Sequence, residues 1–332
     1  MKEITIEKEK QFLSPFAMQS VNTKGREKPE TPCPMRTDFQ RDRDRIIYSK
    51  AFMRLKNKTQ VFFSPEGDHY RTRLTHTLDV SQVARSIARM LSLNEDLAEA
   101  IALGHDLGHT PFGHAGERCL DKLSVHGFKH NEQSLRVVDV LEKDGQGLNL
   151  TFEVRDGILN HKMSLHPATL EGQAVSLADR ISYISHDIDD AIRAGMITVD
   201  DLPHSAINVL GKTTGERINR CIRSIYSASV NKPEVTMEAE VFEALTEVRK
   251  YMFDNVYLSP MAKTEEETAL RMITAMFDYF TKNKDKLPER YLKLLVRFDL
   301  DTVLCDYLSS MTDRYAVYTF ESIFEPKSFF VR

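Results

Sequence analysis

Residues 104–117 read GHDLGHTPFGHAGE, a run that places three histidines, an aspartate and a glutamate among glycines and apolar side chains. Such a density of titratable groups is uncommon in a segment that otherwise looks like buried core, because an unpaired buried carboxylate is costly. The adjacent pair His105 and Asp106 lies near the start of this run. We interpret the run as a functional site rather than as part of a scaffold.

Two further segments carry matching side chains. RTRLTHTLDV, residues 71–80, contains His76, and VSLADRISYISHDIDD, residues 175–190, contains Asp179. With the His105 and Asp106 pair they give the order H…HD…D. Imidazole nitrogen and carboxylate oxygen are donors that suit a divalent ion such as Mn, Mg, Fe, Ni or Zn. The pattern therefore predicts a metal site that leaves positions open for water or substrate.

The chain around Asp106 restricts how this site forms. Neighbouring residues on a helix point about 100° apart, so His105 and Asp106 reach one ion only where a helix is ending. Gly108 and Pro111 predict such an end. No lysine or arginine occurs in residues 96–117, which favours a metal over an ion pair as the partner of Asp106. Asp179 is followed directly by an arginine, so an ion pair is its alternative role.

His114 and Glu117 form a second candidate unit. They stand three residues apart, so on a helix both side chains share one face and the carboxylate can orient the imidazole. Beside a metal, such a pair is suited to general acid and base catalysis. The alternative is a carboxylate at a helix start with an unrelated surface histidine nearby.

The wider sequence contains five recognisable blocks. They are FQRDRDRIIYSKAFMRLKNKTQVF (residues 39–62), RTRLTHTLDV (71–80), GHDLGHTPFGHAGE (104–117), HNEQSLRVV (130–138) and DYLSSMTDRYA (306–316). In this order they resemble the deoxyguanosine triphosphate triphosphohydrolase (dGTPase) family of the HD-domain phosphohydrolase superfamily. The bare H…HD…D order is shared with other phosphodiesterases, whereas the series of five blocks is specific to this family.

The resemblance implies an enzyme that hydrolyses dGTP or another dNTP to deoxynucleoside and inorganic triphosphate, and that assembles as a homo-oligomer. It implies a divalent metal held by His76, His105, Asp106 and Asp179, with His114 and Glu117 as catalytic residues. It also implies substrate contacts by Gln60 (3′-hydroxyl), Arg73, His109 and Arg180 (phosphates), His130 (triphosphate), and Tyr183 and Asp187 (deoxyribose). A structural role in the core or on a helix surface is the alternative for each contact residue.

Apolar spacing predicts an all-α fold, an HD-type helical bundle with additional C-terminal helices. Residues 1–35 have little periodicity and are expected to form an extended lead-in. Residues 36–200 are expected to form the metal-dependent core, and residues 201–332 a helical region packed on it, in one continuous domain. Alternating apolar residues in 315–331, including Val317, Tyr318, Phe320 and Phe330, suggest a few short strands near the C-terminus.

Composition is typical of a soluble cytoplasmic protein. The start MKEITIEKEK lacks an apolar signal core, and no stretch approaches the roughly 20 apolar residues of a membrane span. The scattered cysteines lack metal-site or redox spacing, which indicates reduced thiols. They are Cys33, Cys119, Cys221 and Cys305. The net charge of −4 gives no overall attraction to nucleic acid or acidic lipid.

Two other functions remain open at this point. One is a different HD-type phosphohydrolase, a 5′-nucleotidase or phosphodiesterase, although no GYP tripeptide of the cyclic-dinucleotide branch follows the HD pair. The other is a non-catalytic nucleotide or single-stranded nucleic-acid binder using the basic face of residues 41–58. Such a binder needs aromatic platforms. The available ones are Tyr48, Phe52, Phe62 and Phe63. A solvated face laced by Asp42 and Asp44 is the simpler explanation of these basic residues.

Overall fold

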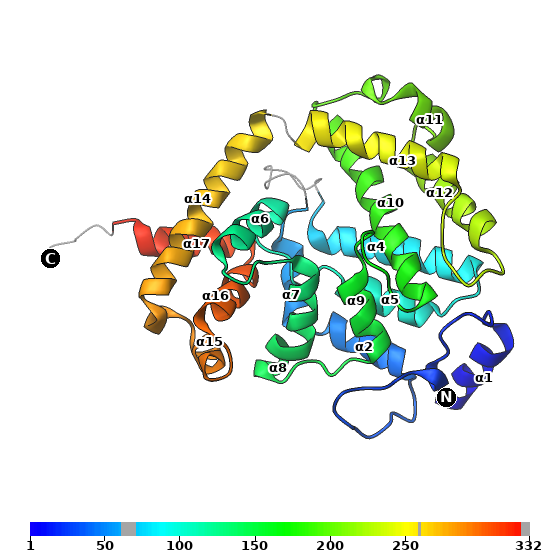
Figure 1. Ribbon diagram of the computed structural model, residues 1–332, viewed down its shortest axis with the longest axis horizontal. Coiled ribbons are helices and arrows are strands. Elements are labelled where there is room, and N and C mark those ends of the chain that lie inside the picture. Colours follow the sequence, from blue (N-terminus) through cyan, green and yellow to red (C-terminus); the bar gives the residue numbers. More distant parts are fainter. Residues whose placement is uncertain (61–70, 258–259, 327–332) are drawn as a thin grey trace.

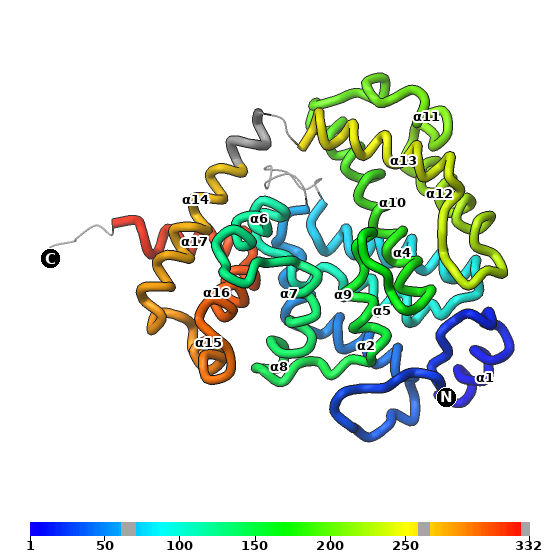
Figure 2. The backbone as a smooth tube through the Cα atoms, in the orientation of Figure 1, coloured from blue at the N-terminus to red at the C-terminus, as the bar shows by residue number. Residues whose placement is uncertain are grey.

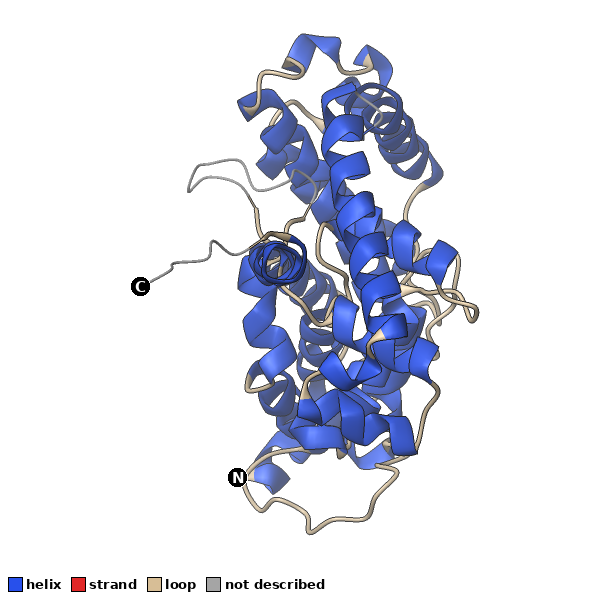
Figure 3. Ribbon diagram, turned by 90° about the vertical axis from the view of Figure 1, so that its left-hand side faces the viewer, coloured by secondary structure: helices blue, strands red, loops and turns tan. Residues whose placement is uncertain are grey.

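The computed structural model describes residues 1–60, 71–257 and 260–326. These residues form an all-α protein, as predicted (Figure 1). Within the described ranges, bridges between extended backbone segments are limited to two isolated pairs, Arg26 with Thr151 and Thr59 with Thr72. Figure 3 accordingly shows helices joined by loops. Phe62, Phe63 and Phe330, which the sequence singled out, lie outside the described residues.

The α-helices are joined by loops of different lengths and by short 3₁₀-helical segments. In chain order they are α1 (Lys2–Phe12), α2 (Asp38–Ile47), α3 (Lys50–Arg54), α4 (Arg73–Met90), α5 (Glu95–Gly104), α6 (Gly113–Leu123), α7 (His130–Arg136), α8 (Glu142–Gly145), α9 (Phe152–Asn160), α10 (Leu170–Arg193), α11 (His204–Leu210), α12 (Thr214–Ser229), α13 (Ala239–Met252), α14 (Pro260–Lys282), α15 (Glu289–Leu292), α16 (Leu300–Ser309) and α17 (Asp313–Phe324). Two π-helical segments extend α7 and α13, over Val137–Leu141 and Phe253–Tyr257.

Helices α4, α5 and α10 pack together at the centre of the first hydrophobic cluster. Their inward residues Ile87, Ile101 and Ile181 are at most 1% exposed. Burial of each such side chain contributes roughly 1.5–3 kcal/mol before the cost of ordering the chain is subtracted. Thr72 caps α4 through a capping box, and Asn94 caps α5 by accepting from Leu97 N. The packing therefore fixes the start of α4 and the end of α5 beside α10.

A second hydrophobic cluster joins α6 to the C-terminal helices. Leu120 of α6 belongs to the same cluster as Ile273 and Met276 of α14 and Leu304 and Leu308 of α16. In Figure 1 α6 correspondingly lies beside α14. The first cluster also includes residues of α11, α12 and α13, so apolar packing crosses residue 200. The division of the chain proposed from the sequence stays a prediction.

The lead-in is helical at its start, which corrects the expectation of an extended segment. Residues 2–12 form α1, and Figure 2 shows the following segment looping along the lower edge of the molecule. Glu9 anchors α1 because its carboxylate accepts from Ser20 N at 2.7 Å and from Asn94 Nδ2 at 3.2 Å. Helical propensity and this anchor outweigh the weak apolar periodicity of the segment.

The predicted C-terminal strands are also wrong where the chain is described. Residues 313–324 form α17, which Thr312 caps by accepting from Tyr315 N at 3.2 Å. Ala316 and Thr319, three residues apart, are its buried positions, as helical spacing requires. Val317 and Tyr318 are exposed on this helix, 37% and 64%, so they do not form the buried face that a strand would require.

Two predictions about the chain's environment can be compared with the structure. All four cysteines are free thiols, as their spacing suggested. Within the described part of the chain, every helix is too short or too polar to span a lipid bilayer.

Candidate active site

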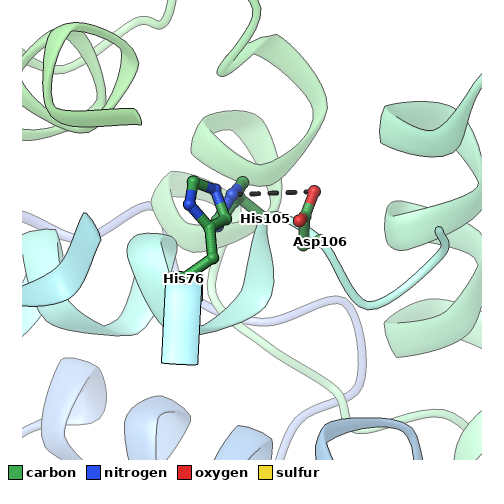
Figure 4. A group of neighbouring side chains, drawn as sticks. All are labelled: His76, His105 and Asp106. Carbon is green, nitrogen blue, oxygen red and sulfur yellow. Dashed lines mark ion pairs between the residues drawn. The ribbon is translucent and has the colours of Figure 1, made fainter. Parts of the chain in front are cut away.

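Three predicted ligands come together where α4 begins and α5 ends (Figure 4). His76 lies in the first turn of α4, and His105 is the residue at which α5 ends, so Asp106 turns away from the helix. One ligating atom from each lies within 4.8 Å of those of the other two. The His105 Nε2 to Asp106 Oδ1 distance is 3.6 Å. The predicted helix end is confirmed, and it lets adjacent residues face one point.

Asp179 joins this group from the middle of α10. Its Oδ1 lies 3.1 Å from His76 Nε2 and 3.7 Å from His105 Nε2. The alternative ion pair with Arg180 is absent from the described contacts, because that guanidinium donates to Thr246 Oγ1 at 2.6 Å and stacks over the Phe242 ring. Asp179 therefore lies beside the two histidines of the mutually close group formed by His76, His105 and Asp106.

The donor set fits a divalent metal. His105 Nδ1 donates to the Ala102 carbonyl at 2.7 Å, so the lone pair of the neutral ring lies on Nε2. This Nε2 atom is buried and has no hydrogen-bond partner among the described residues. A histidine that binds a metal through one ring nitrogen usually donates a hydrogen bond from the other nitrogen to a carbonyl or carboxylate. His105 has this arrangement, and its free nitrogen faces two carboxylates.

Asp106 has a cationic partner that its sequence neighbourhood did not reveal. Arg73 Nη1 donates to its Oδ2 at 2.7 Å, and both side chains are nearly inaccessible to solvent. The sequence favoured a metal over an ion pair as the partner of Asp106, because no basic residue lies near it in the chain. That argument was wrong, because Arg73 forms such an ion pair. Long-range packing of α4 on α5 supplies the arginine, and it leaves Oδ1 of Asp106 facing His105.

Both carboxylates of the group stay ionised. Burial raises the pKa of Asp106, but the electrostatic influence of the neighbouring His105 and Arg73 side chains outweighs it and holds the pKa well below its usual range. Burial acts in the same direction on Asp179, and the hydrogen bond from His76 lowers its pKa to about 2. The buried Asp106 carboxylate and the half-buried Asp179 carboxylate, with one fixed guanidinium, leave a local deficit of positive charge, which a divalent cation would offset.

A shell of further histidines lies beside Asp106. His109 stacks on His130 with ring centroids 4.4 Å apart, and ligating atoms of both lie within 4.8 Å of one from Asp106. His130 Nε2 also lies 3.3 Å from Nε2 of His161, which the sequence analysis missed. Burial lowers the pKa of His161 to about 3 and holds that of His109 well below its usual value. These two rings are neutral at physiological pH.

Glu117 links this shell to the predicted catalytic histidine, His114. Residues 113–123 are helical, so the face-sharing predicted for the pair is confirmed: His114 Nδ1 donates to Glu117 Oε2 at 3.2 Å. His130 Nδ1 donates to Glu117 Oε1 at 2.8 Å, and Lys162 Nζ lies 3.6 Å from the same oxygen. Burial raises the pKa of Glu117, but the two histidine hydrogen bonds outweigh it and keep the carboxylate ionised. The His114 side chain is 64% exposed, so its Nε2 edge is open to an incoming molecule.

Close backbone packing brings α7 and α6 to this site. A Cβ added at Gly108 would lie 2.2 Å from Ser134 N, so only glycine lets the turn after Asp106 touch α7. A Cβ at Gly116 would lie 2.1 Å from the Pro111 carbonyl oxygen. Both approaches are too short for any side chain.

Both residues implied at the deoxyribose lie on α10, and the sequence analysis did not identify their partners. Tyr183 Oη accepts from Arg249 Nε at 2.7 Å. Asp187 accepts from the Tyr257 hydroxyl, and burial raises its pKa to about 7. Both partners belong to α13 or its π-helical extension.

Gln60, implied at the 3′-hydroxyl, lies next to Arg73. Its backbone carbonyl accepts from Arg73 Nη2 at 3.3 Å. Its side-chain Oε1 is buried without a hydrogen-bond partner in the described structure. The contacts of Gln60, Arg180, Tyr183 and Asp187 leave their substrate roles as predictions.

His161 and Lys162 had a weak sequence signal. They begin HKMSLH, which directly follows α9, but no regular spacing connects them to the H…HD…D order. His161 is fixed because its Nδ1 donates to the Ile158 carbonyl at 2.8 Å. A tertiary contact between α9 and α7 brings them to the site.

Comparison with known proteins places this geometry in a family. The HD domain model matches residues 73–184, a range that holds all four candidate ligands, and the phosphohydrolase-associated domain model matches residues 215–322. A phosphohydrolase from Bacteroides thetaiotaomicron has a similar fold, with a TM-score of 0.56 and 17% identity, covering 85% of this chain and 69% of that one.

Sequence relatives are closer. The chain is 54% identical to a deoxyguanosinetriphosphate triphosphohydrolase-like protein of Caldanaerobacter subterraneus subsp. tengcongensis, covering 99% of this chain and 97% of that protein. It is 47% identical to one of Desulfatibacillum aliphaticivorans, covering 96% and 97%. Because these matches extend over nearly its whole length, the chain belongs to the deoxyguanosinetriphosphate triphosphohydrolase-like proteins, a family of HD-domain phosphohydrolases.

Proposed function

We propose that the protein is a metal-dependent dNTP triphosphohydrolase that releases a deoxynucleoside and inorganic triphosphate. The observation that carries this proposal is the convergence of His76, His105 and Asp106 with Asp179 around an unpartnered His105 Nε2. The names of the relatives supply the substrate class, and dGTP is the first substrate to test.

The four converging side chains would hold the ion. When bound, a divalent cation supplies positive charge that polarises a phosphoryl oxygen and lowers the pKa of water. Which of Mn, Mg, Fe, Ni and Zn serves in the cell follows from geometry and availability, since all five accept this donor set.

His114 is our candidate for proton transfer. Its Nδ1 proton is held by Glu117, so its exposed Nε2 can carry or accept a second proton. Water adds to the α-phosphorus and releases a proton to solvent, the bond from that phosphorus to the 5′-oxygen breaks, and the leaving oxygen takes up the Nε2 proton of His114, which solvent then restores. Glu117 stabilises the charged imidazole and is itself fixed by His130. The triphosphate leaves in one piece.

The triphosphate needs positive charge along its length, since phosphoryl transfer is catalysed mainly by positioning and charge neutralisation. Lys162 is 30% exposed at the side of Glu117 and is suited to a phosphate contact. We keep Arg180 and His109 as proposed phosphate contacts. Arg73 donates to Asp106 through Nη1 and to the Gln60 carbonyl through Nη2, which favours a role in holding Asp106.

Nucleic-acid binding by the basic face of residues 41–58 is less well supported. Arg43 pairs with Asp96 at 3.0 Å and with Glu99 at 3.2 Å, and Arg45 pairs with Glu30 at 2.7 Å. These contacts neutralise much of the face. The basic residues are thus better explained as a solvated face paired with acidic residues. These partners come from other segments as well as from Asp44.

The decisive assay supplies each dNTP and rNTP to the purified protein with Mn or Mg and identifies the products by chromatography. Inorganic triphosphate with deoxynucleoside is the expected result. Pyrophosphate would assign the protein to another class of nucleotide hydrolase, and turnover of dGMP or a cyclic dinucleotide alone would favour the rival HD-type phosphohydrolase. Homo-oligomer formation and a cytoplasmic location stay predictions, which light scattering and fractionation would test.

A further inference from the structure

The last of the five sequence blocks, residues 306–316, has no role in the proposed chemistry. It covers the end of α16 and the start of α17, in the C-terminal region. Two of its carboxylates, Asp306 and Asp313, reach out of that region and bind segments that carry active-site residues. The block therefore contacts the segments that position active-site residues.

Asp313 holds the turn that precedes α6. Its Oδ1 accepts from Phe112 N at 3.0 Å, and its Oδ2 accepts from Thr59 N at 2.9 Å and from the Thr59 hydroxyl. Phe112 has a φ of 61°, and Gly113 has a φ of 58°. A left-handed conformation at a bulky residue is unfavourable by itself and persists where surrounding contacts impose it. The turn sets the direction of α6 immediately before His114.

Lys58 holds the other end of the same turn. Its ammonium is buried, with 2% of the residue exposed, and donates to the carbonyl oxygens of His109 and Ser309. One of these carbonyls belongs to the turn, and the other belongs to the C-terminal block. Residues 109–113 are thus fixed at both ends by contacts that lead to α16 and α17.

Asp306 makes an equivalent connection to α7. It is fully buried and accepts from Gln133 Nε2 at 2.9 Å and from Arg136 Nε at 2.7 Å. His130, which orients Glu117, begins that helix. The turn that precedes α6 and the helix α7, which carries His130, are therefore both connected to the same C-terminal block.

We propose, on the basis of the function proposed above, that Asp313 and Lys58 are positioning residues for the catalytic pair. They hold residues 109–113 in the conformation that directs His114 and Glu117 toward the metal ligands, and they touch neither metal nor substrate. The C-terminal region is then part of the catalytic apparatus, which assigns a role to the block 306–316. A misplacement of ~1 Å in such a group can lower a rate by about 100-fold.

Asp313→Asn is the sharpest test. The amide keeps the size of the side chain, but it presents a donor to either Phe112 N or Thr59 N and breaks one contact. Asp301→Asn is the matched control, because Asp301 also lies in the C-terminal region and accepts from Ser124 Oγ at 2.5 Å and Val125 N at 3.3 Å, beyond the far end of α6. Both variants should keep their metal content and their cooperative thermal unfolding.

The expected result is that Asp313→Asn lowers kcat by about tenfold or more with KM for the dNTP nearly unchanged, whereas Asp301→Asn keeps kcat. Hydrogen exchange of a peptide covering residues 109–118 should also become faster in Asp313→Asn alone. Unchanged kcat and unchanged exchange in Asp313→Asn would overturn the proposal. If the wild-type protein hydrolyses no dNTP, the proposed function fails, and the exchange comparison still decides whether Asp313 holds the turn.

Discussion

Arg73 donates to Asp106 across 2.7 Å in the interior of the protein, so one of the four candidate ligands is paired with a guanidinium before any metal binds. Removing one partner of a buried ion pair typically costs about 3–5 kcal/mol, because the other charge is left uncompensated. A metal cation at the adjacent site can provide that missing compensation. Stability and metal binding are thereby coupled through Asp106.

Arg73→Met should therefore lower the melting temperature strongly in EDTA and less strongly with Mn present. The stabilisation produced by Mn should be larger in the variant than in the wild type, because the ion replaces the lost positive charge. Differential scanning fluorimetry with and without Mn measures both shifts. Equal Mn-induced shifts in the two proteins would show that Asp106 does not bind the metal.

Substitution of a histidine that binds the metal and substitution of the histidine that transfers the proton should have different effects. His105→Ala should abolish both metal content and turnover, whereas His114→Ala should keep the metal and lose about 100- to 10,000-fold in kcat, the usual contribution of a general acid or base. His126→Ala is a matched control, since that histidine is 60% exposed and pairs with Asp299 away from the site. Metal analysis and kcat should be measured on the same preparations. Full activity in His114→Ala would disprove its assigned role.

The buried carboxyl group of Glu171 should make the stability of the protein depend on pH, independently of the metal. Its carboxylate is buried and accepts from Met18 N and Asn94 N, and burial raises its pKa from 4.5 to about 7. A raised carboxyl pKa means that the folded protein binds the proton more tightly than the unfolded chain. The free energy of unfolding should then fall as pH rises from about 4.5 to 7, by roughly 3 kcal/mol for this group.

The comparison of wild type with Glu171→Gln isolates that contribution. The amide retains the acceptor oxygen but cannot ionise, so the variant should gain stability relative to the wild type as pH rises through this window. Urea unfolding at several pH values gives the difference directly. A difference that does not change with pH would mean that Glu171 is not buried as described.

Gly108→Ala should destabilise the protein by about 1–3 kcal/mol or more, because the new Cβ would lie 2.2 Å from the α7 backbone and one of the two segments must move. The matched control is Gly215→Ala in α12, where a Cβ meets no described atom within 4 Å. Because Gly215 lies in the first turn of α12, that variant should gain at most about 0.5 kcal/mol from helix propensity. Opposite signs in thermal unfolding are expected, and equal effects would contradict the close contact between the turn and α7.

The sequence correctly predicted the features that depend on residues close together in the chain. The end of a helix at His105 followed from adjacent ligands that must face one ion, and the pairing of His114 with Glu117 followed from helical spacing. These features depend on residues within a few positions of one another.

Contacts between distant segments escaped prediction. Arg73 reaches Asp106 from another helix, and His161 reaches His130 through the packing of α9 on α7. No spacing rule connects such pairs. The helices α1 and α17 were missed for a different reason, since their weak or ambiguous apolar patterns resemble an irregular segment and a strand.

Anomalous scattering from a crystal grown with Mn tests the central claim most directly. We predict one strong peak bonded to His76, His105, Asp106 and Asp179, close to the present positions of their side chains. A peak at the surface group of His126, Asp299 and Asp301, with none among the four predicted ligands, would contradict the account.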